Sequence, residues 1–193
     1  MKISEKGIFL LKNLGKGLGW LFFLLLVFFF LKKNLGEHSL DPLAPVLNRP
    51  GVILLIYVVS EVAFGIIPPE IFMLWGLRAG SPTAYAGWVG IFAMISYAAG
   101  IIGYAIGYTL QTTRFFRYVR RYRLRKYEAH LQKFGSMLVI VASMTPLPFS
   151  AICMLVGSAR YSFPRFLVMA LTRFVRYALY AYLIWEANVM VPA

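Results

Sequence analysis

Residues 51–80, which read GVILLIYVVSEVAFGIIPPEIFMLWGLRAG, decide the fold of this chain. The stretch is apolar, but its middle holds Glu61, Gly65, Pro68, Pro69 and Glu70. Two consecutive prolines remove two backbone donors and break a helix. A straight membrane span would therefore place carboxylates and broken backbone in hydrocarbon, where irregular backbone is tolerated only inside protein or beside a wet cavity. The pattern predicts two short helices that meet at Gly65–Pro69 as a re-entrant hairpin, called the first hairpin below.

Residues 134–159 repeat this pattern as FGSMLVIVASMTPLPFSAICMLVGSA. The apolar stretch is interrupted at Thr145, Pro146 and Pro148 and then resumes, which predicts a second re-entrant hairpin. The Thr145 hydroxyl is expected to satisfy a carbonyl that the break frees, and direct contact with a ligand is the alternative. Two interrupted segments in one membrane protein are a sequence pointer to a transporter binding site.

Two uninterrupted apolar stretches, residues 83–111 and 163–188, are predicted to be transmembrane helices. Each is longer than the roughly 20 residues that a span needs. In the first, Gly100, Gly103 and Gly107 lie at positions i, i+3 and i+7. This spacing predicts one smooth helix face against which another helix packs closely.

The composition excludes a soluble domain. The 193 residues are 60% hydrophobic and only 14% charged, whereas an average soluble domain is about a quarter charged. The 20 Lys and Arg against 7 Asp and Glu give a net charge of +13, and basic loops between apolar segments are typical of a membrane protein. The apolar runs leave no soluble fold that would display a nucleic-acid-binding patch. A single cysteine, Cys153, excludes a disulfide framework and a cysteine zinc site.

The N-terminal part, residues 1–33, is predicted to be an arm followed by an uncleaved first transmembrane helix at roughly residues 14–32. A secretory signal peptide is the alternative, but no small-residue cleavage site follows the apolar run. Residues 8–16 either extend this helix or lie flat as an amphipathic arm. Residues 34–50 hold prolines and mixed charges, which predicts an extracytoplasmic loop.

A basic linker, residues 113–133, separates the two halves of the predicted core, residues 51–188. We expect the linker to lie as an amphipathic helix on an anionic leaflet. RNA binding through its interleaved aromatic and basic residues is the alternative. The residues predicted to contact the membrane surface are Arg117, Arg120, Arg121, Arg123, Arg125 and Lys126.

The positive charges also predict the topology. With a cytoplasmic N-terminus, the first helix leads out, the first hairpin returns to the outside, and helix 83–111 brings the basic linker back to the cytoplasm, as the positive-inside rule requires. If residues 51–80 crossed the membrane instead, the basic linker would lie outside. The predicted fold class is an all-α integral membrane protein with about three transmembrane helices and two re-entrant hairpins of opposite entry.

Glu61 and Glu70 are the first candidate site residues. They are nine positions apart, so on one straight helix they would face opposite sides, and only a chain reversal brings both to one cavity. An ionisable group at membrane depth is a functional hypothesis by default. Burial and a neighbouring carboxylate both disfavour the charged form of a carboxyl group, which predicts a proton-coupling role. The alternative is a position at the headgroup level or, for Glu70, in the first turn of a helix.

Arg173 and Arg176 lie three residues apart inside the last predicted helix, hence on one helix face. A guanidinium binds phosphate through two parallel hydrogen bonds. Facing inward, the two arginines would hold a lipid phosphate or pair with Glu61 and Glu70. The alternative is that they snorkel to the headgroups. On the same helix, Trp185 and the tyrosines at 177, 180 and 182 are expected to form an interfacial aromatic belt.

The residue types do not indicate an enzyme or a metal protein. An intramembrane phosphatase or acyltransferase needs a nucleophile with a base, or a metal site. The two histidines, His38 and His130, are far apart in predicted loops. We therefore expect no catalytic residues, no metal and no cofactor.

The order and spacing of these features resemble the DedA proteins, also called the SNARE-associated or VTT-domain superfamily, over about residues 50–186. The matching pieces are Glu61-Val-Ala-Phe-Gly-Ile-Ile-Pro68-Pro69-Glu70, the Gly100/Gly103/Gly107 helix, and Phe134-Gly135 followed by the Pro146–Pro148 break, Gly157 and Arg160-Tyr-Ser-Phe-Pro-Arg165-Phe166.

One departure from the family pattern concerns the second hairpin, which in the family usually carries Arg-Phe-x-Pro-x-x-Arg. Here the aligned stretch is Thr145-Pro-Leu-Pro148-Phe-Ser-Ala151, so both arginines are absent. The chain looks more like a branch with a Thr-Pro-x-Pro turn and two arginines on the next helix. Whether Arg173 and Arg176 replace the missing pair is open at this point.

The resemblance implies lipid translocation. Bacterial relatives are associated with moving undecaprenyl phosphate or phospholipid across the cytoplasmic membrane, driven by protons or sodium, and eukaryotic relatives scramble phospholipids. We expect a proton-coupled transporter of a phosphate-bearing lipid in a bacterial cytoplasmic membrane. An uncoupled scramblase and a structural or assembly protein are the alternatives. The expected partners are membrane lipids and further copies of the chain, and not nucleic acid.

Overall fold

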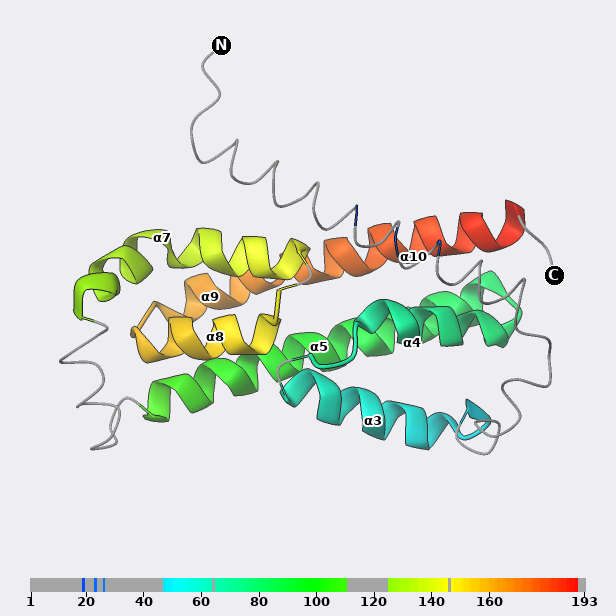
Figure 1. Cartoon of the computed structure of the whole chain (residues 1–193), viewed down its shortest axis with the longest axis horizontal. Coiled ribbons are helices and arrows are strands. Elements are labelled where there is room, and N and C mark those ends of the chain that lie inside the picture. Colours follow the sequence, from blue (N-terminus) through cyan, green and yellow to red (C-terminus); the bar gives the residue numbers. More distant parts are fainter. Residues whose placement is uncertain are drawn as a thin grey trace, which may run out of the picture.

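The structure is a computed structural model of the chain. It describes residues 19, 23, 26, 47–63, 65–110, 125–145 and 147–190, without the side chains of 125–134 and 190. Over these ranges every regular element is a helix (Figure 1). Several predictions concern residues outside these ranges. They are the predictions for the rest of residues 1–46, for Pro146, and for most of the basic linker, including Arg117, Arg120, Arg121 and Arg123.

Two long helices run the length of the described part (Figure 1). Helix α5 spans Pro82–Leu110, and its first turn is capped by Ser81, whose hydroxyl accepts the amide of Ala84. Helices α9 (Phe163–Ala170) and α10 (Thr172–Met190) follow each other with only Leu171 between them. Both Pro82–Leu110 and Phe163–Val189 are long and apolar enough to cross a membrane, because 20 helical residues already reach about 30 Å.

The first hairpin consists of α3 (Pro50–Val62), α4 (Pro69–Gly76) and the short 3-10 helix η2 (Leu77–Ala79). Between α3 and α4 the chain reverses, with Gly65 at a φ of +68°, a conformation that favours glycine. The two ends of the hairpin lie next to each other, and the Trp75 indole donates a hydrogen bond to the Leu47 carbonyl at 2.8 Å. The chain therefore returns to the end at which it started (Figure 1).

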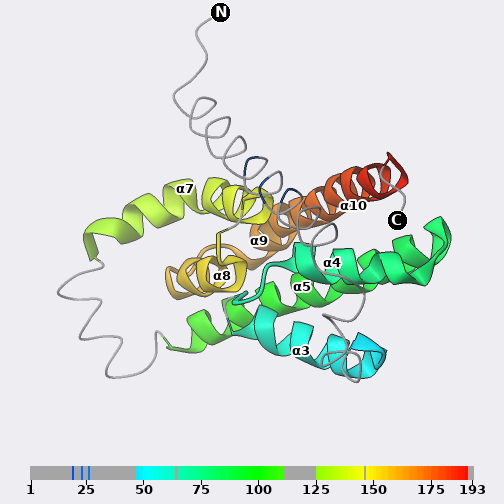
Figure 2. The same cartoon turned by 45° about the vertical axis from the view of Figure 1, so that its right-hand side comes forward.

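The second hairpin consists of α7 (Arg125–Met144) and α8 (Phe149–Ser158), with the break at residues 145–148. It opens toward the opposite end of the molecule from the first hairpin (Figures 1 and 2). Helix α7 begins at Arg125, within the range that the sequence assigned to the basic linker. No proline or glycine interrupts residues 125–133, so the helix that enters the hairpin extends back to Arg125 and includes Lys126.

The predicted glycine face of α5 lies against α8. A Cβ on Gly103 would approach the Ser150 carbonyl oxygen to 2.6 Å, and a Cβ on Gly107 would collide with the carbonyl of Met154. Gly157 of α8 meets the backbone of α5 in the same way at Tyr104. The two helices are thus in direct backbone contact, which side chains at these positions would prevent.

The buried side chains form two clusters. The first joins α3, α4, the first half of α5 and most of α10, and the second joins the second half of α5 with α7, α8 and α9. Tyr177 and Tyr180 belong to the first cluster and are 1% and 3% exposed, so the prediction that they form an interfacial belt is wrong. They lie on the α10 face that packs against the first hairpin, whereas Tyr182 is exposed.

The packing predicts opposite effects for two glycines of α5. Gly107→Ala should lower the free energy of unfolding by about 1–3 kcal/mol, because the new methyl group overpacks the α5–α8 contact. Gly87→Ala should raise it by about 1 kcal/mol, because alanine favours helix and a Cβ there meets nothing within 4 Å. Unfolding midpoints of both variants in detergent check this, and equal effects would contradict the backbone contact.

Candidate site of two buried arginine–glutamate pairs

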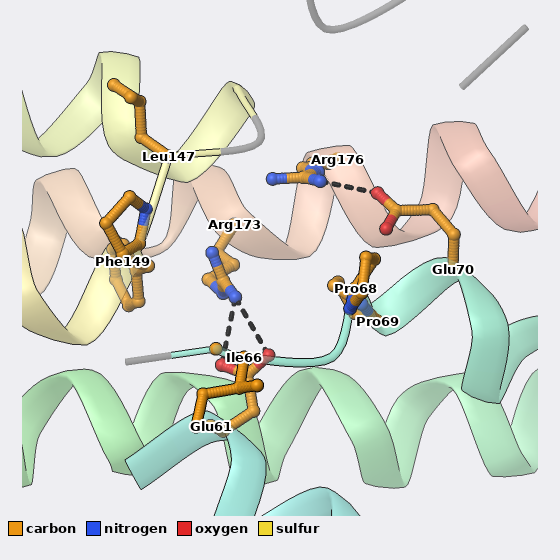
Figure 3. A pocket seen from close by; sticks show the side chains of 11 residues that line it. Glu61, Ile66, Pro68, Pro69, Glu70, Leu147, Phe149, Arg173 and Arg176 are labelled. Carbon is orange, nitrogen blue, oxygen red and sulfur yellow. Dashed lines mark hydrogen bonds and ion pairs between the residues drawn. The ribbon is translucent and has the colours of Figure 1, made fainter. Parts of the chain in front are cut away.

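Four buried charged side chains come together where the two hairpin breaks reach α10 (Figure 3). Glu61 lies in the last turn of α3, Glu70 in the first turn of α4, and Arg173 and Arg176 on one face of α10. None is more than 3% exposed. The structure therefore brings together all four residues that the sequence singled out for transport and phosphate binding, and it turns both arginines inward.

Arg173 pairs with Glu61. Its Nη2 lies 3.0 and 3.2 Å from the two carboxylate oxygens. Ser96 of α5 bridges the two side chains beside their direct contact. Its hydroxyl donates to Glu61 Oε2 at 2.6 Å and accepts a hydrogen bond from Arg173 Nε. The guanidinium also lies over the Phe149 ring, 4.3 Å from the ring centre. Glu61, Ser96 and Arg173 thus form a closed three-residue contact from three helices.

Arg176 makes a different set of contacts. Its Nη2 lies 2.5 Å from Glu70 Oε1, and its Nη1 donates to the backbone carbonyl of Thr145 at 2.5 Å. One arginine therefore connects the start of α4 to the break of the second hairpin. Glu70 is a first-turn acid of α4, as one of the two interpretations of the sequence expected, and it is also the ion-pair partner of Arg176.

The hydroxyl groups at the breaks bond to backbone carbonyls and amides. Thr145 Oγ1 donates to Val141, and Ser150 Oγ donates to the Glu61 carbonyl at 2.8 Å. In the first hairpin, Ser60 Oγ accepts the amide of Ile67 at 2.8 Å. The contacts of Ser150 and Ser60 satisfy backbone groups that a helix end or break leaves open, and Ser150 joins the two hairpins directly. The Val141 carbonyl already accepts the Thr145 amide, so the Thr145 hydroxyl adds a second hydrogen bond to it rather than satisfying a freed carbonyl.

A cavity of about 220 Å³ lies between the two breaks. Two polar atoms of residues that line it have no hydrogen-bond partner among the described residues, Glu70 Oε2 and Arg173 Nη1. A buried polar atom without a partner costs roughly 1–3 kcal/mol. The cavity is lined by Glu61, Gly65, Ile66, Pro68, Pro69, Glu70, Leu147, Pro148, Phe149, Arg173 and Arg176 (Figure 3).

This arrangement combines two positive and two negative groups, and all four side chains are buried. Adding a proton to either carboxyl group removes one negative charge and leaves a guanidinium in need of a new anion. Guanidinium groups that lose a carboxylate partner have the chemistry to bind another anion, such as a phosphate. Within the described part of the chain no three His, Cys, Asp or Glu side chains gather as metal ligands.

The sequence reasoning missed Ser96 and Phe149 as site residues. Ser96 lies four positions before Gly100 on the same face of α5, so it extends the row of small residues at 100, 103 and 107. That spacing was a usable signal, because a polar member of a small-residue row can face the contact between helices. Phe149 carried no comparable signal, since its position under Arg173 depends on how α8 packs.

Comparison with known proteins gives one family and one relative. The family model of the VTT domain matches residues 50–186, from the first residue of α3 into α10. A curated protein of Methanocaldococcus jannaschii, described only as uncharacterized, is 27% identical over 121 residues, which are 62% of this chain and 74% of that protein. No solved structure matches the chain significantly.

The buried pair of α4 and α10 should respond strongly to the loss of one partner. Arg176→Met leaves Glu70 as a buried charge and should lower the free energy of unfolding by about 3–5 kcal/mol. The double variant Arg176→Met/Glu70→Leu should recover most of this loss, because no unpaired charge remains. Unfolding in detergent measures both, with Arg78→Met as the exposed-arginine control. A double variant no more stable than Arg176→Met would contradict the pairing.

Proposed function

Because the chain belongs to the VTT-domain family of membrane proteins, also named DedA or SNARE-associated, we propose that it moves a phosphate-bearing lipid between the leaflets of a membrane. Proton movement through Glu61 and Glu70 drives the transport in this proposal. The lipid is undecaprenyl phosphate or a phospholipid. The protein acts without covalent chemistry and is not an enzyme, and its partners are lipids rather than nucleic acid.

One observation carries the proposal: two buried arginines face a cavity between two broken helices, and each is held by a carboxylate. Guanidinium groups bind phosphate with charge-assisted hydrogen bonds. A cavity between interrupted helices is where membrane transporters place their substrates. The family's second hairpin usually carries arginines that this chain lacks, and Arg173 and Arg176 supply guanidinium groups beside that hairpin from α10.

Transport follows from competition for the arginines. When the carboxylates are charged, they occupy the guanidinium groups and exclude a second anion. When a carboxyl group takes up a proton, its hold on the guanidinium weakens, and the lipid phosphate replaces it as counter-ion. Loss of the proton restores the ion pair and releases the phosphate. The guanidinium thus has an anionic partner in both end states, a carboxylate in one and the lipid phosphate in the other, which limits the cost of burying its charge.

The proposed position in the membrane follows the two chain reversals. Helices α5 and α9–α10 cross the bilayer, and both hairpins enter it only to their breaks, from opposite sides. The contacts that close the open end of the first hairpin support this arrangement, since Leu47 and Trp75 then lie on the same side. With a cytoplasmic N-terminus and basic linker, the orientation satisfies the positive-inside rule in a bacterial cytoplasmic membrane.

Lipid flipping in proteoliposomes tests the proposed transport. Labelled phospholipid and labelled polyprenyl phosphate are assayed separately, with and without a pH gradient. We expect gradient-dependent flipping of one of them that is lost in Glu61→Gln and in Arg176→Ala. Arg165→Ala, which removes an exposed arginine of α9, should leave flipping unchanged.

Two other results would redirect the interpretation. Flipping that ignores the gradient and survives Glu61→Gln would make the protein a passive scramblase and remove the carboxylates from the mechanism. Absence of flipping for both lipids by folded protein would refute transport of these lipids and favour a structural or assembly role.

Cysteine labelling tests the re-entrant topology. In a Cys153→Ala background, Gly51→Cys and Arg78→Cys mark the two ends of the first hairpin, and Ser162→Cys marks the end of the second; all three positions are exposed. We expect an impermeant maleimide to label positions 51 and 78 from the same side of the membrane and position 162 from the other. Labelling of 51 and 78 from opposite sides would show that residues 51–80 cross the membrane.

A further inference from the structure

The three nitrogens of the Arg173 guanidinium have three different surroundings. Nε donates to the hydroxyl of Ser96, and Nη2 contacts both carboxylate oxygens of Glu61. Nη1 has no hydrogen-bond partner among the described residues, although Arg173 is only 3% exposed. Arginine usually grips a carboxylate with two nitrogens at once. Here a single nitrogen, Nη2, contacts both carboxylate oxygens, while the serine takes Nε.

Arg176 differs in a way that matters for ligand binding. Its Nη2 contacts Glu70, but its Nη1 donates to the backbone carbonyl of Thr145. A backbone carbonyl stays an acceptor at any physiological pH. Protonation of Glu70 would therefore free one terminal nitrogen of Arg176 and leave the other bound. Protonation of Glu61, in contrast, would leave both terminal nitrogens of Arg173 without a carboxylate.

We propose that Arg173 is the lipid-phosphate ligand and that Ser96 is the positioning residue that presents it, an inference that rests on the proposed function. When Glu61 is protonated, Ser96 keeps its hydrogen bond to Nε. The guanidinium then stays in place, and its Nη1 and Nη2 edge forms a two-donor fork for one phosphate group. Arg176 instead holds the breaks of the two hairpins together.

The position of Ser96 suits this role. Its helix is held by the backbone contact between α5 and α8, and its side chain is fully buried. Its oxygen accepts from Nε while its proton goes to the carboxyl group of Glu61, and a protonated carboxyl group still offers one accepting oxygen. The hydrogen bond to Nε therefore survives protonation. The Phe149 ring lies against one face of the Arg173 guanidinium and limits movement of the guanidinium toward that side.

The surroundings of Glu61 identify which groups a pH effect could involve. The titratable or charged groups that act on it are Tyr57 on its own helix, Cys153 of α8, and Tyr177 and Arg173 of α10. The two tyrosine hydroxyls bond to each other at 2.5 Å, and Tyr57 also donates to the Phe92 carbonyl at 3.0 Å. Arg173 is the only cation in this set, so loss of the Glu61 charge removes the ion pair of Arg173 and no other ion pair in the set.

Binding of dodecyl phosphate to the full chain in maltoside micelles tests the inference without requiring transport. The dissociation constant is measured by ³¹P NMR, and dodecanol serves as a competitor that lacks the phosphate. Glu61→Gln imitates the protonated carboxyl group and should tighten binding several-fold. Glu70→Gln should not, because Thr145 still occupies Arg176.

Ser96 is then tested in the Glu61→Gln background. Ser96→Ala should weaken binding about tenfold, the effect of losing one hydrogen bond to a charged group. Ser96→Thr keeps the hydroxyl, so the double variant should bind dodecyl phosphate as tightly as Glu61→Gln alone. Ser143→Ala is the matched control, because Ser143 is equally buried and its hydroxyl bonds to its own helix at Val139. Thermal unfolding of each variant identifies any that fail to fold.

The outcomes separate this inference from the proposed function. No binding of dodecyl phosphate by the unmutated protein or by Glu61→Gln would refute the phosphate site itself. Phosphate-specific binding that is unchanged by Ser96→Ala, or weakened equally by Ser143→Ala, would overturn the role of Ser96. Tightening by Glu70→Gln as large as that by Glu61→Gln would overturn the distinction between the two arginines. Phosphate-specific weakening by Ser96→Ala alone would support the inference.

Discussion

Two arginines buried inside a membrane protein must each have a counter-charge at hand, and the described structure is arranged to provide it. An isolated charge moved into a protein interior costs several kcal/mol even after relaxation, and only a well-placed partner offsets that cost. Arg173 and Arg176 sit on one face of α10, so both carboxylates have to arrive from outside that helix. The first hairpin delivers Glu61 at the end of one helix and Glu70 at the start of the next. A straight helix through the same residues would have placed them on opposite sides.

The packing of α5 against α8 is part of the same arrangement. Because glycines allow the two backbones to touch, the start of α8 lies close enough for Ser150 to bond to the Glu61 carbonyl and for Phe149 to lie under Arg173. Ser96 reaches the ion pair from the same helix face of α5. Helix packing and site geometry therefore depend on each other, and a change in the α5–α8 contact would move site atoms as well as lower stability.

The two ion pairs are similar in composition and unlike in connection. The Glu61–Arg173 pair includes a serine hydroxyl and leaves one guanidinium nitrogen unused, whereas the Glu70–Arg176 pair is tied to a backbone carbonyl. The two guanidinium groups therefore differ in what still holds them if their carboxylates are removed: a serine hydroxyl at Nε of Arg173 and a backbone carbonyl at Nη1 of Arg176. In the proposed transport cycle this difference assigns ligand binding to the first pair and the joining of the hairpins to the second. Such a division of roles lets the site open toward a ligand without separating the two breaks.

The sequence by itself determined the helical class, both interrupted segments, the glycine contact face and the family, which the VTT-domain match confirms. These follow from local rules: proline breaks helices, apolar length sets a span, and small residues at helical spacing make a face. It also named Glu61, Glu70, Arg173 and Arg176 as candidates, because ionisable residues in apolar runs stand out.

Only the tertiary structure decided which glutamate pairs with which arginine. The partners are 112 and 106 positions apart, and no periodicity links residues over such distances. The insertion of Ser96, the support by Phe149 and the burial of Tyr177 depend equally on how separate helices pack. Sequence patterns report the face of a single helix, whereas a site built from five helices is set by the packing between them.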